Sequence, residues 1–353
     1  MADVTVETPT AGPAPRDERL RTISPWARLL QRPELGSVIG AVLVFAWFAL
    51  TTDTFAQPGG IARWTDIAST LGIMAVVVAL LMIGGEFDLS AGVMTGTSGL
   101  VVGLLISEVG LHVWLAIILT FAFALAVGFT NGMLVIKTGL PSFIVTLGSF
   151  FVLRGANLGF TKLITDVVRV ENLDEGDGYV SAARVFASTF WPPYNFRVSV
   201  LWWLAIAAVA TWVLMRTRFG NWIFSAGGDP VAARKVGVPV ARTKIALFMT
   251  TSAAAALVGI MLALRLKSAQ ASEGVGREFE FIIAAVAGGC LLTGGYGSAI
   301  GASVGALIMG MAFIGIPASG WNTDWRFLFL GVILFGAVLV NELVRRRAKA
   351  GRA

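Results

Sequence analysis

The sequence has very few of the side chains that form covalent cross-links, metal sites and catalytic triads. It holds one cysteine and one histidine in 353 residues, which excludes an intramolecular disulfide. It also leaves no His/Cys cluster for zinc and no Ser-His-Asp triad. No G-x-x-x-x-G-K-[ST] stretch occurs, so we expect no nucleotide site on this chain. These absences argue against bond chemistry performed by the chain itself.

Charged residues are scarce as well. They make up 14% of the chain, against about 25% in a soluble domain. Apolar residues make up 56%, and the mean hydropathy is +0.79. This composition indicates an all-α integral membrane protein. The net charge of +6 does not indicate nucleic-acid binding, because the basic residues cluster at expected membrane boundaries.

Ten stretches are candidates for transmembrane helices, each of which needs about 20 mostly apolar residues. They are 36–54, 65–84, 90–107, 112–136, 141–160, 198–215, 244–266, 280–293, 299–316 and 326–344. The third is rich in Gly and Thr and the eighth is short, so we expect one or two broken or re-entrant segments. The transmembrane domain is thus predicted over 35–344, after a disordered cytoplasmic tail over 1–34.

The distribution of charge predicts the orientation. The loop 216–243 and the tail 345–353 are rich in Lys and Arg, so the positive-inside rule places both in the cytoplasm. The long loop 161–197 carries acids and is predicted to lie outside. With ten spans, both termini are cytoplasmic.

A short capped helix is predicted within the loop 216–243. Asp229 is a good N-cap, Pro230 suits the first helical position, and Gly237 can end the helix. Two turns are therefore predicted over 230–236. A helix this short is not stable alone in water, so it must pack on something. We expect it to receive force from a cytosolic partner; the alternative is a helix that lies on its own membrane.

Four stretches resemble one family, the permease subunits of ribose-type ABC importers, which take up monosaccharides. They are "GGEFDLSAG" (84–92), "NGMLVIKTGLPSFIVTLGSFFVLRG" (131–155), "RTRFGNWIFSAGGDPVAARKVGVPVARTK" (216–244) and "GREFEFIIAAVAGGCLLTGGYGSAIGASVGALIMG" (276–310). The resemblance covers residues 65–310 almost continuously. The chain departs from the family pattern at Glu86–Phe87 and at Arg277, which leaves the identity of the substrate open.

The resemblance implies a multi-pass permease of the bacterial inner membrane that moves a monosaccharide or related polyol. It implies three partners: a cytosolic ATPase with two fused nucleotide-binding domains, a periplasmic or lipid-anchored sugar-binding protein, and a second permease copy, identical or not. ATP and Mg would bind to the ATPase, and this chain would hold no cofactor or metal and bind no nucleic acid. The alternative function is an ion-coupled secondary transporter, which would need an ionisable group near the middle of a span.

Two groups of residues are predicted to carry this function. The small apolar face of the 230–236 helix, centred on Ala232 and Ala233, is expected to enter a groove on the ATPase. The coupling residues are Gly228, Asp229, Pro230, Ala232, Ala233, Arg234 and Gly237.

The predicted substrate pathway comprises Asp88, Ser90, Thr95, Thr97, Ser98, Asn131, Thr146 and Ser149. The alternative for these hydroxyls is a hydrogen bond back to their own helix. We interpret Arg154 as half of a structural pair, and Arg265 and Lys267 as interfacial residues.

Overall fold

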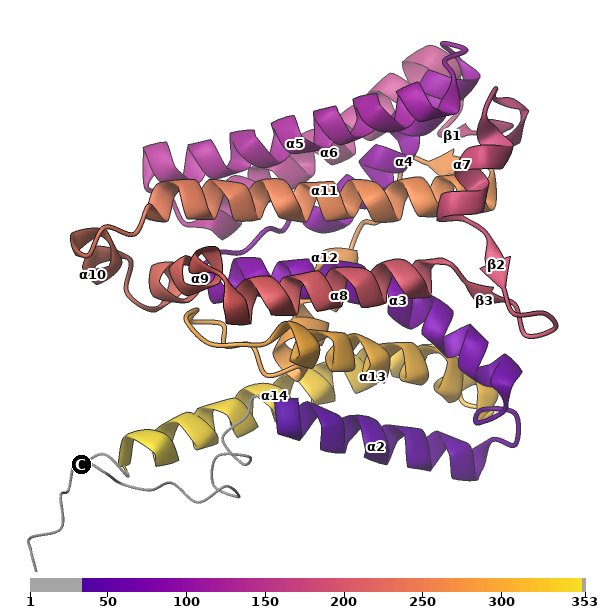
Figure 1. Ribbon diagram of the computed structural model, residues 1–353. Coiled ribbons are helices and arrows are strands. Elements are labelled where there is room, and N and C mark those ends of the chain that lie inside the picture. The colour runs from indigo at the N-terminus through magenta and orange to yellow at the C-terminus, as the bar shows by residue number, and fades with distance from the viewer. Residues whose placement is uncertain (1–33, 351–353) are drawn as a thin grey trace, which may run out of the picture.

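The computed structural model describes residues 34–350, and side chains as far as residue 339. Its helices lie side by side in one bundle (Figure 1). Seven of the described helices are long and apolar enough to cross a membrane. They are α2 (Glu34–Thr51), α3 (Pro58–Ile83), α5 (Val113–Thr138), α6 (Ser142–Thr165), α8 (Ser199–Arg216), α11 (Val240–Leu266) and α13 (Ala299–Ala318).

Three further helices occupy the remaining predicted spans. They are α4 (Ala91–Ser107), α12 (Arg277–Ala287) and α14 (Trp325–Ala350). The 11 residues of α12 rise about 16 Å, roughly half of the ~30 Å hydrocarbon core. The third predicted span is preceded by a non-helical stretch over 84–90, and the eighth contains only this half-length helix. Each of the ten predicted stretches thus contains one helix, and the two weakest are the two irregular ones.

The centre of the bundle is α3. In its most apolar window 89% of the residues are buried, compared with 67% in α11 and α13 and 17% in α2. Because lipid is as apolar as these side chains, close approach through small residues must hold the helices together. Gly310 on α13 shows this, because a Cβ there would lie 2.6 Å from the carbonyl oxygen of Trp64 on α3.

The two ends of the bundle carry different elements, and Figure 1 shows them at the left and right. The α10 end carries α9 (Arg218–Gly228) and α10 (Pro230–Lys235). The α7 end carries α7 (Tyr179–Phe186), the 3-10 helix η1 (Leu173–Glu175) and four strands. The strands are β1 (Arg169–Val170), β2 (Thr189–Phe190), β3 (Phe196–Arg197) and β4 (Ala269–Gln270), which pair antiparallel as β1–β4 and β2–β3. The protein is mostly helical, as predicted.

Each of the two predicted loops has one boundary that is wrong by about one turn, and α3 begins at Pro58, about two turns before the predicted start at 65. The loop predicted over 161–197 begins inside α6, which continues to Thr165, and α11 begins at Val240 inside the loop predicted over 216–243. Both extensions contain charged residues, Lys162 and Arg242, whose long side chains can reach the interface from a helix end. Hydropathy therefore underestimates these helices. The predicted tail over 1–34 lies outside the described residues except for Glu34, and residues 345–350 of the basic tail continue α14.

Candidate functional site

The capped helix predicted from the sequence is present as α10. The carboxylate of Asp229 accepts hydrogen bonds from the backbone N–H groups of Val231 and Ala232, both at 2.9 Å. Pro230 is the first helical residue, and Gly237 adopts φ +85° just beyond the helix. The helix ends at Lys235, one residue earlier than predicted.

The face that α10 presents to solvent differs from the predicted one. Ala233 is 4% exposed and packs against Ala226 and Val240 of the same chain, so it cannot enter a groove on a partner. The reason is physical: a helix of six residues needs one face anchored to its own fold. The outward apolar surface is formed by Val231, Ala232 and Val236, with exposed fractions of 61% for Val231 and 80% for Val236.

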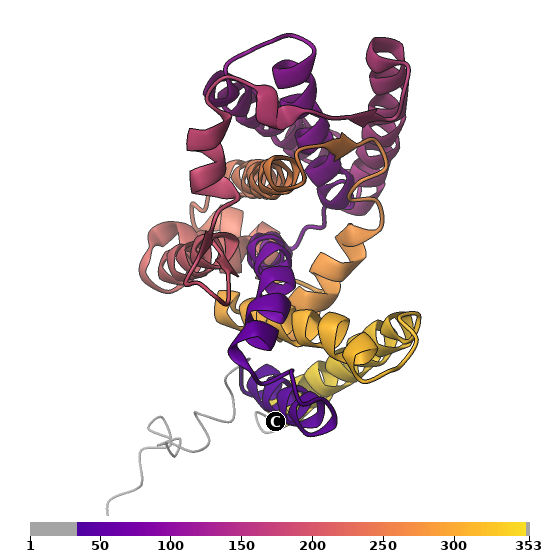
Figure 2. The same cartoon turned by 90° about the vertical axis from the view of Figure 1, so that its right-hand side faces the viewer.

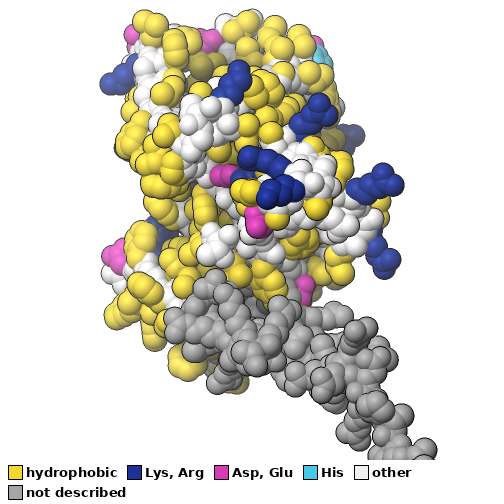
Figure 3. All heavy atoms as spheres, turned by 90° about the vertical axis from the view of Figure 1, so that its left-hand side faces the viewer, with side chains coloured by type: hydrophobic (Ala, Val, Ile, Leu, Met, Phe, Trp, Pro, Cys, Tyr) yellow, Lys and Arg dark blue, Asp and Glu magenta, His cyan; other side chains and the backbone are white. Residues whose placement is uncertain are grey.

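Basic side chains surround this surface at the α10 end, as Figure 3 shows. Six of them are exposed: Lys137, Arg216, Arg218, Arg234, Lys235 and Arg242. The α10 end thus combines a small apolar surface with a rim of positive charge, a combination that suits contact with a partner.

Three Gly-Gly pairs meet directly behind α10. Gly227 is the residue before the last in α9, and it lies so close to the end of α3 that a Cβ there would overlap the carbonyl oxygen of Ile83, the last residue of α3. The same carbonyl accepts a hydrogen bond from the backbone N–H of Gly295 at 2.8 Å. A Cβ on Gly294 would lie 2.8 Å from the Cα of Gly85. We call this backbone contact the glycine junction, and it joins α9 to the end of α3 and to the loop before α13.

Five of the predicted pathway residues form one buried polar network. Asp88 Oδ1 accepts from the backbone N–H (2.9 Å) and the hydroxyl (2.5 Å) of Ser90. Asn131 on α5 donates to Ser90 Oγ at 3.1 Å, and Ser149 on α6 donates to Asn131 Oδ1 at 2.6 Å. Thr146 on α6 joins it by accepting from a backbone N–H of the same segment at 3.0 Å. Asp88 Oδ2 is buried and has no hydrogen-bond partner among the described residues.

This network stabilises the irregular backbone between α3 and α4. Thr146 Oγ1 accepts from the N–H of Leu89, and Ser142 Oγ accepts from the N–H of Phe87, each at 3.0 Å. A buried N–H without a partner is costly, and a non-helical segment inside a bundle leaves several of them. Hydroxyl groups on α6 therefore permit the break over 84–90.

The other three predicted pathway residues, all on α4, are not part of this network. Thr95, Thr97 and Ser98 are buried, and their hydroxyls donate to carbonyl oxygens of their own helix at 2.7–2.9 Å. In this conformation each hydroxyl therefore forms a hydrogen bond within its own helix, which is the alternative to lining the substrate pathway.

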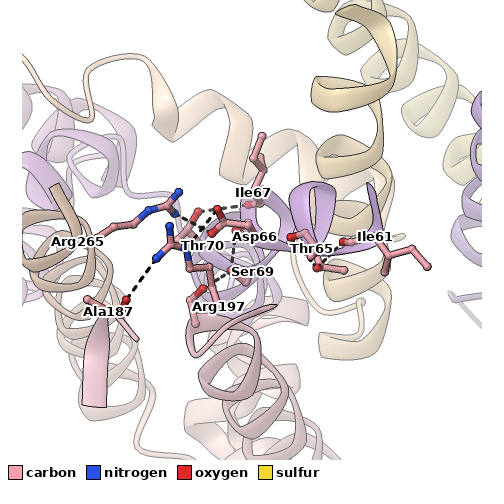
Figure 4. A network of polar contacts seen from close by, with 11 residues as sticks. Ile61, Thr65, Asp66, Ile67, Ser69, Thr70, Ala187, Arg197 and Arg265 are labelled. Carbon is pink, nitrogen blue, oxygen red and sulfur yellow. Dashed lines mark hydrogen bonds and ion pairs between the residues drawn. The ribbon is translucent and has the colours of Figure 1, made fainter. Parts of the chain in front are cut away.

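Ion pairs hold α11 at both of its ends. At the α7 end, Arg265 donates to Asp66 on α3 at 2.8 Å, and the guanidinium of Arg197 lies 4.0 Å from the same carboxylate (Figure 4). Partial burial, together with the neighbouring Arg265, lowers the pKa of Arg197. At the α10 end, Lys244 pairs with Glu86, and both side chains are almost fully buried.

The sequence interpretation of Arg265 as a purely interfacial residue is therefore incomplete. The sequence did contain a signal, because Asp66 is the single carboxylate inside the span predicted over 65–84. Arg154 lacks the predicted structural partner among the described residues.

The α7 end carries an acidic cavity. Its volume is about 780 Å³, and its lining includes Glu108, Glu171, Glu175 and Asp177. Close by, Lys267 donates to Asp174 at 2.8 Å. This hydrogen bond lowers the pKa of Asp174 and raises the pKa of Lys267.

Comparison with known proteins identifies the family. The family model described as "Branched-chain amino acid transport system / permease component" matches residues 60–338. Three similar proteins are YphD of Escherichia coli K12, a probable ABC transporter permease protein, the ribose import permease protein RbsC of Escherichia coli K12, and the fructose import permease protein FrcC of Rhizobium meliloti. YphD is 30% identical over 90% of this chain and 92% of its own length. RbsC is 28% identical over 88% of this chain and 94% of its own length, and FrcC is 29% identical over 79% of this chain and 76% of its own length.

No solved structure gives a significant match. The family model alone covers well over half of the chain, and it does so across the helices and junctions described above. The chain therefore belongs to this family of transport permeases and is the membrane subunit of an ABC importer.

Proposed function

We propose that this chain is the inner-membrane permease of an ATP-driven importer for a monosaccharide or related polyol. The similarity to permeases named for ribose and fructose supports the substrate class. The single structural observation that carries the coupling role is the position of α10, which is exposed on one side and joined to α3 through the glycine junction on the other.

The proposed topology has ten crossings with both termini in the cytoplasm. One crossing each is assigned to the seven long helices, to α4, to α12 with its flanking non-helical segments, and to α14. Both ends of the bundle carry exposed Lys and Arg residues, but among the described residues those around α10 face a single exposed carboxylate, Asp229, whereas the other exposed acids lie at the α7 end. The positive-inside rule therefore assigns the α10 end to the cytoplasm. The acidic cavity then lies outside, where a sugar-binding protein would dock.

In this proposal, α10 is the coupling helix. A cytosolic ATPase, with two fused nucleotide-binding domains, would contact Val231, Ala232 and Val236, while Arg234 would contribute to the rim. Gly228, Asp229 and Pro230 set the start of the helix and Gly237 sets its end, so they fix the direction of this surface. Movement of α10 would reach α3 through Gly227, because backbone contacts without intervening side chains cannot be absorbed by rotamer changes.

The buried network is proposed to belong to the wall of the substrate pathway. It supports the break before α4, and it places Asp88, Asn131 and Ser149 together at the depth where α4 begins. Thr95, Thr97 and Ser98 would become available only in a state in which α4 moves relative to its neighbours. A second permease copy would complete the pathway, and ATP and Mg would be held by the ATPase.

The coupling role can be tested with Val231→Asp and Val236→Asp in the complete importer. A buried, unpaired carboxylate at the contact should abolish co-purification of the ATPase and sugar uptake together. The matched control for co-purification of the ATPase is Val180→Asp on α7, because Val180 is 70% exposed at the opposite end of the bundle. Full uptake in the Val231/Val236 double variant would show that the ATPase docks elsewhere.

The importer class can be tested with the purified permease alone in liposomes. We expect no uptake of D-ribose, D-fructose or D-xylose when a proton or sodium gradient is imposed. Uptake should require the ATPase, the binding protein and ATP. Uptake driven by an ion gradient alone would overturn the ABC mechanism for this chain.

A further inference from the structure

Charged side chains occur at membrane depth along one side of the bundle. Arg154 is the thirteenth of the 24 residues of α6, about 18 Å from either end of that helix, and it is exposed. Arg277 and Glu280 lie in the first turn of α12, with side chains 29% and 23% exposed. Figure 2 shows α6, α12 and α14 along the same side of the bundle, with α8 on the opposite side.

The start of α12 lies deep inside the bundle. A Cβ on Gly92 would lie 2.6 Å from the backbone nitrogen of Glu278, so the two residues are at the same level. Gly92 is the second residue of α4, whose remaining turns rise about 22 Å toward the α7 end. The stretch from Ala271 to Gly276 that leads to α12 is therefore non-helical backbone at membrane depth.

Neither feature is compatible with contact to lipid. Charged side chains within a membrane face a partner, the bundle interior or a water-filled cavity. Irregular backbone at this depth is tolerated only where it is buried in protein or lines such a cavity. The exposed side of α8 shows the contrast, because its exposed residues between 201 and 212 are all apolar. That side can face lipid, and the α12 side cannot.

We infer that the segment from Ser272 to Glu280 is the sugar-contacting wall of the passage; this rests on the proposed function. Phe279 is 58% exposed and offers an aromatic face. Arg277 offers a planar set of donors. Beside it, Glu280 Oε2 is buried, has no hydrogen-bond donor among the described residues and lies 3.9 Å from Arg277 Nε. An apolar surface with a few convergent polar groups is the arrangement that binds small polar ligands.

The same residues also suit the geometry of a pore between two permease copies. Among the described helices, α12 packs against α3, α4, α13 and α14, and Phe279 and Ser272 remain uncovered. A second copy facing this side would enclose the segment in a shared passage. Arg154 on α6 would then meet water or the other copy instead of lipid.

The inference can be tested by accessibility of introduced cysteines. The background is Cys290→Ala, since Cys290 is the single cysteine. In the complete importer in liposomes, Phe279→Cys and Ser272→Cys should react with a charged, water-soluble thiol reagent in at least one nucleotide state. Val209→Cys on α8 is the matched control, because Val209 is 60% exposed in the protomer yet should be shielded by lipid. Val180→Cys on α7 is the control for an accessible position.

Two outcomes would overturn the inference. If Phe279→Cys and Ser272→Cys resist the reagent in every nucleotide state while Val180→Cys reacts, the segment is a dry contact between copies. If the importer takes up D-ribose, D-fructose or D-xylose but that sugar at saturating concentration does not slow the labelling, the segment does not contact sugar.

Transport by Glu280→Gln and Phe279→Ala gives a second measurement. We expect the KM of uptake for the transported sugar to rise at least tenfold, with the ATPase still co-purifying. An unchanged KM in both variants would count against sugar contact. Loss of all sugar uptake in the wild-type importer would instead refute the proposed function, and the labelling pattern would still decide whether the segment lines an aqueous passage.

Discussion

Replacing Gly227 by Ala should uncouple ATP hydrolysis from transport. The added methyl group would overlap the Ile83 carbonyl oxygen and would lie 2.8 Å from the backbone nitrogen of Gly295, so the glycine junction must open. Overpacking of this kind costs about 1–3 kcal/mol. Disrupting the hydrogen bond from Gly295 to Ile83 costs about 1 kcal/mol more.

An opposing effect has to be subtracted. Alanine is favoured over glycine inside a helix by roughly 0.5–1 kcal/mol, and Gly227 lies in α9. The net cost is therefore about 1–3 kcal/mol. We expect the helix bundle to remain folded at this cost, while the backbone contacts of the glycine junction separate. Since about 1.4 kcal/mol corresponds to tenfold in an equilibrium, we expect roughly 5- to 100-fold less sugar transported per ATP hydrolysed.

The assay compares sugar uptake and ATP hydrolysis in reconstituted importers. The ATPase should still co-purify with Gly227→Ala, because the outward face of α10 is unchanged. Gly36→Ala is the matched control, since a Cβ at Gly36 on α2 meets no atom within 4 Å. Uptake per ATP within twofold of wild type, with an unchanged melting temperature, would refute the idea that the junction transmits motion.

Three further predictions concern single contacts. In a double-mutant cycle, Asp66→Asn and Arg265→Gln should each lower the melting temperature of the purified protein. The double variant should lose less than the sum of the two single losses, and additive losses would show that the two side chains do not stabilise the protein as an ion pair. Asp229→Ala should cost about 1 kcal/mol of α10 stability, seen as faster amide exchange over 230–236, while Asp229→Asn should restore most of it. The pKa of Asp174 is lowered from its ordinary value of 3.8 and the pKa of Lys267 is raised from 10.5, so their contact should be fully formed between these two pH values. It should be lost when the pH falls through the lowered pKa of Asp174 or rises through the raised pKa of Lys267. Amide exchange near β1 and β4 should show this, and Asp174→Asn should remove the acidic limb of the profile.

The positions of the long apolar helices and the cap of α10 depend on local patterns, and the sequence predicts both. Apolar runs of sufficient length can form only helices in a bilayer, whatever they pack against. Likewise, the bonds from Asp229 join residues two and three positions apart, so they need no distant partner. The resemblance to sugar permeases also follows from local motifs, and the comparison with known proteins confirms it.

The contacts between distant segments were decided only by the tertiary structure. Ala233 and Ala232 are adjacent and chemically identical, yet one is buried because α9 and α11 cover it. The pairs Asp66–Arg265 and Glu86–Lys244 join residues 199 and 158 positions apart, which no periodicity relates. The glycine junction is the clearest case, since each Gly-Gly pair by itself predicts only a turn. Their meeting depends on how three helix ends pack, and packing is a property of the whole bundle.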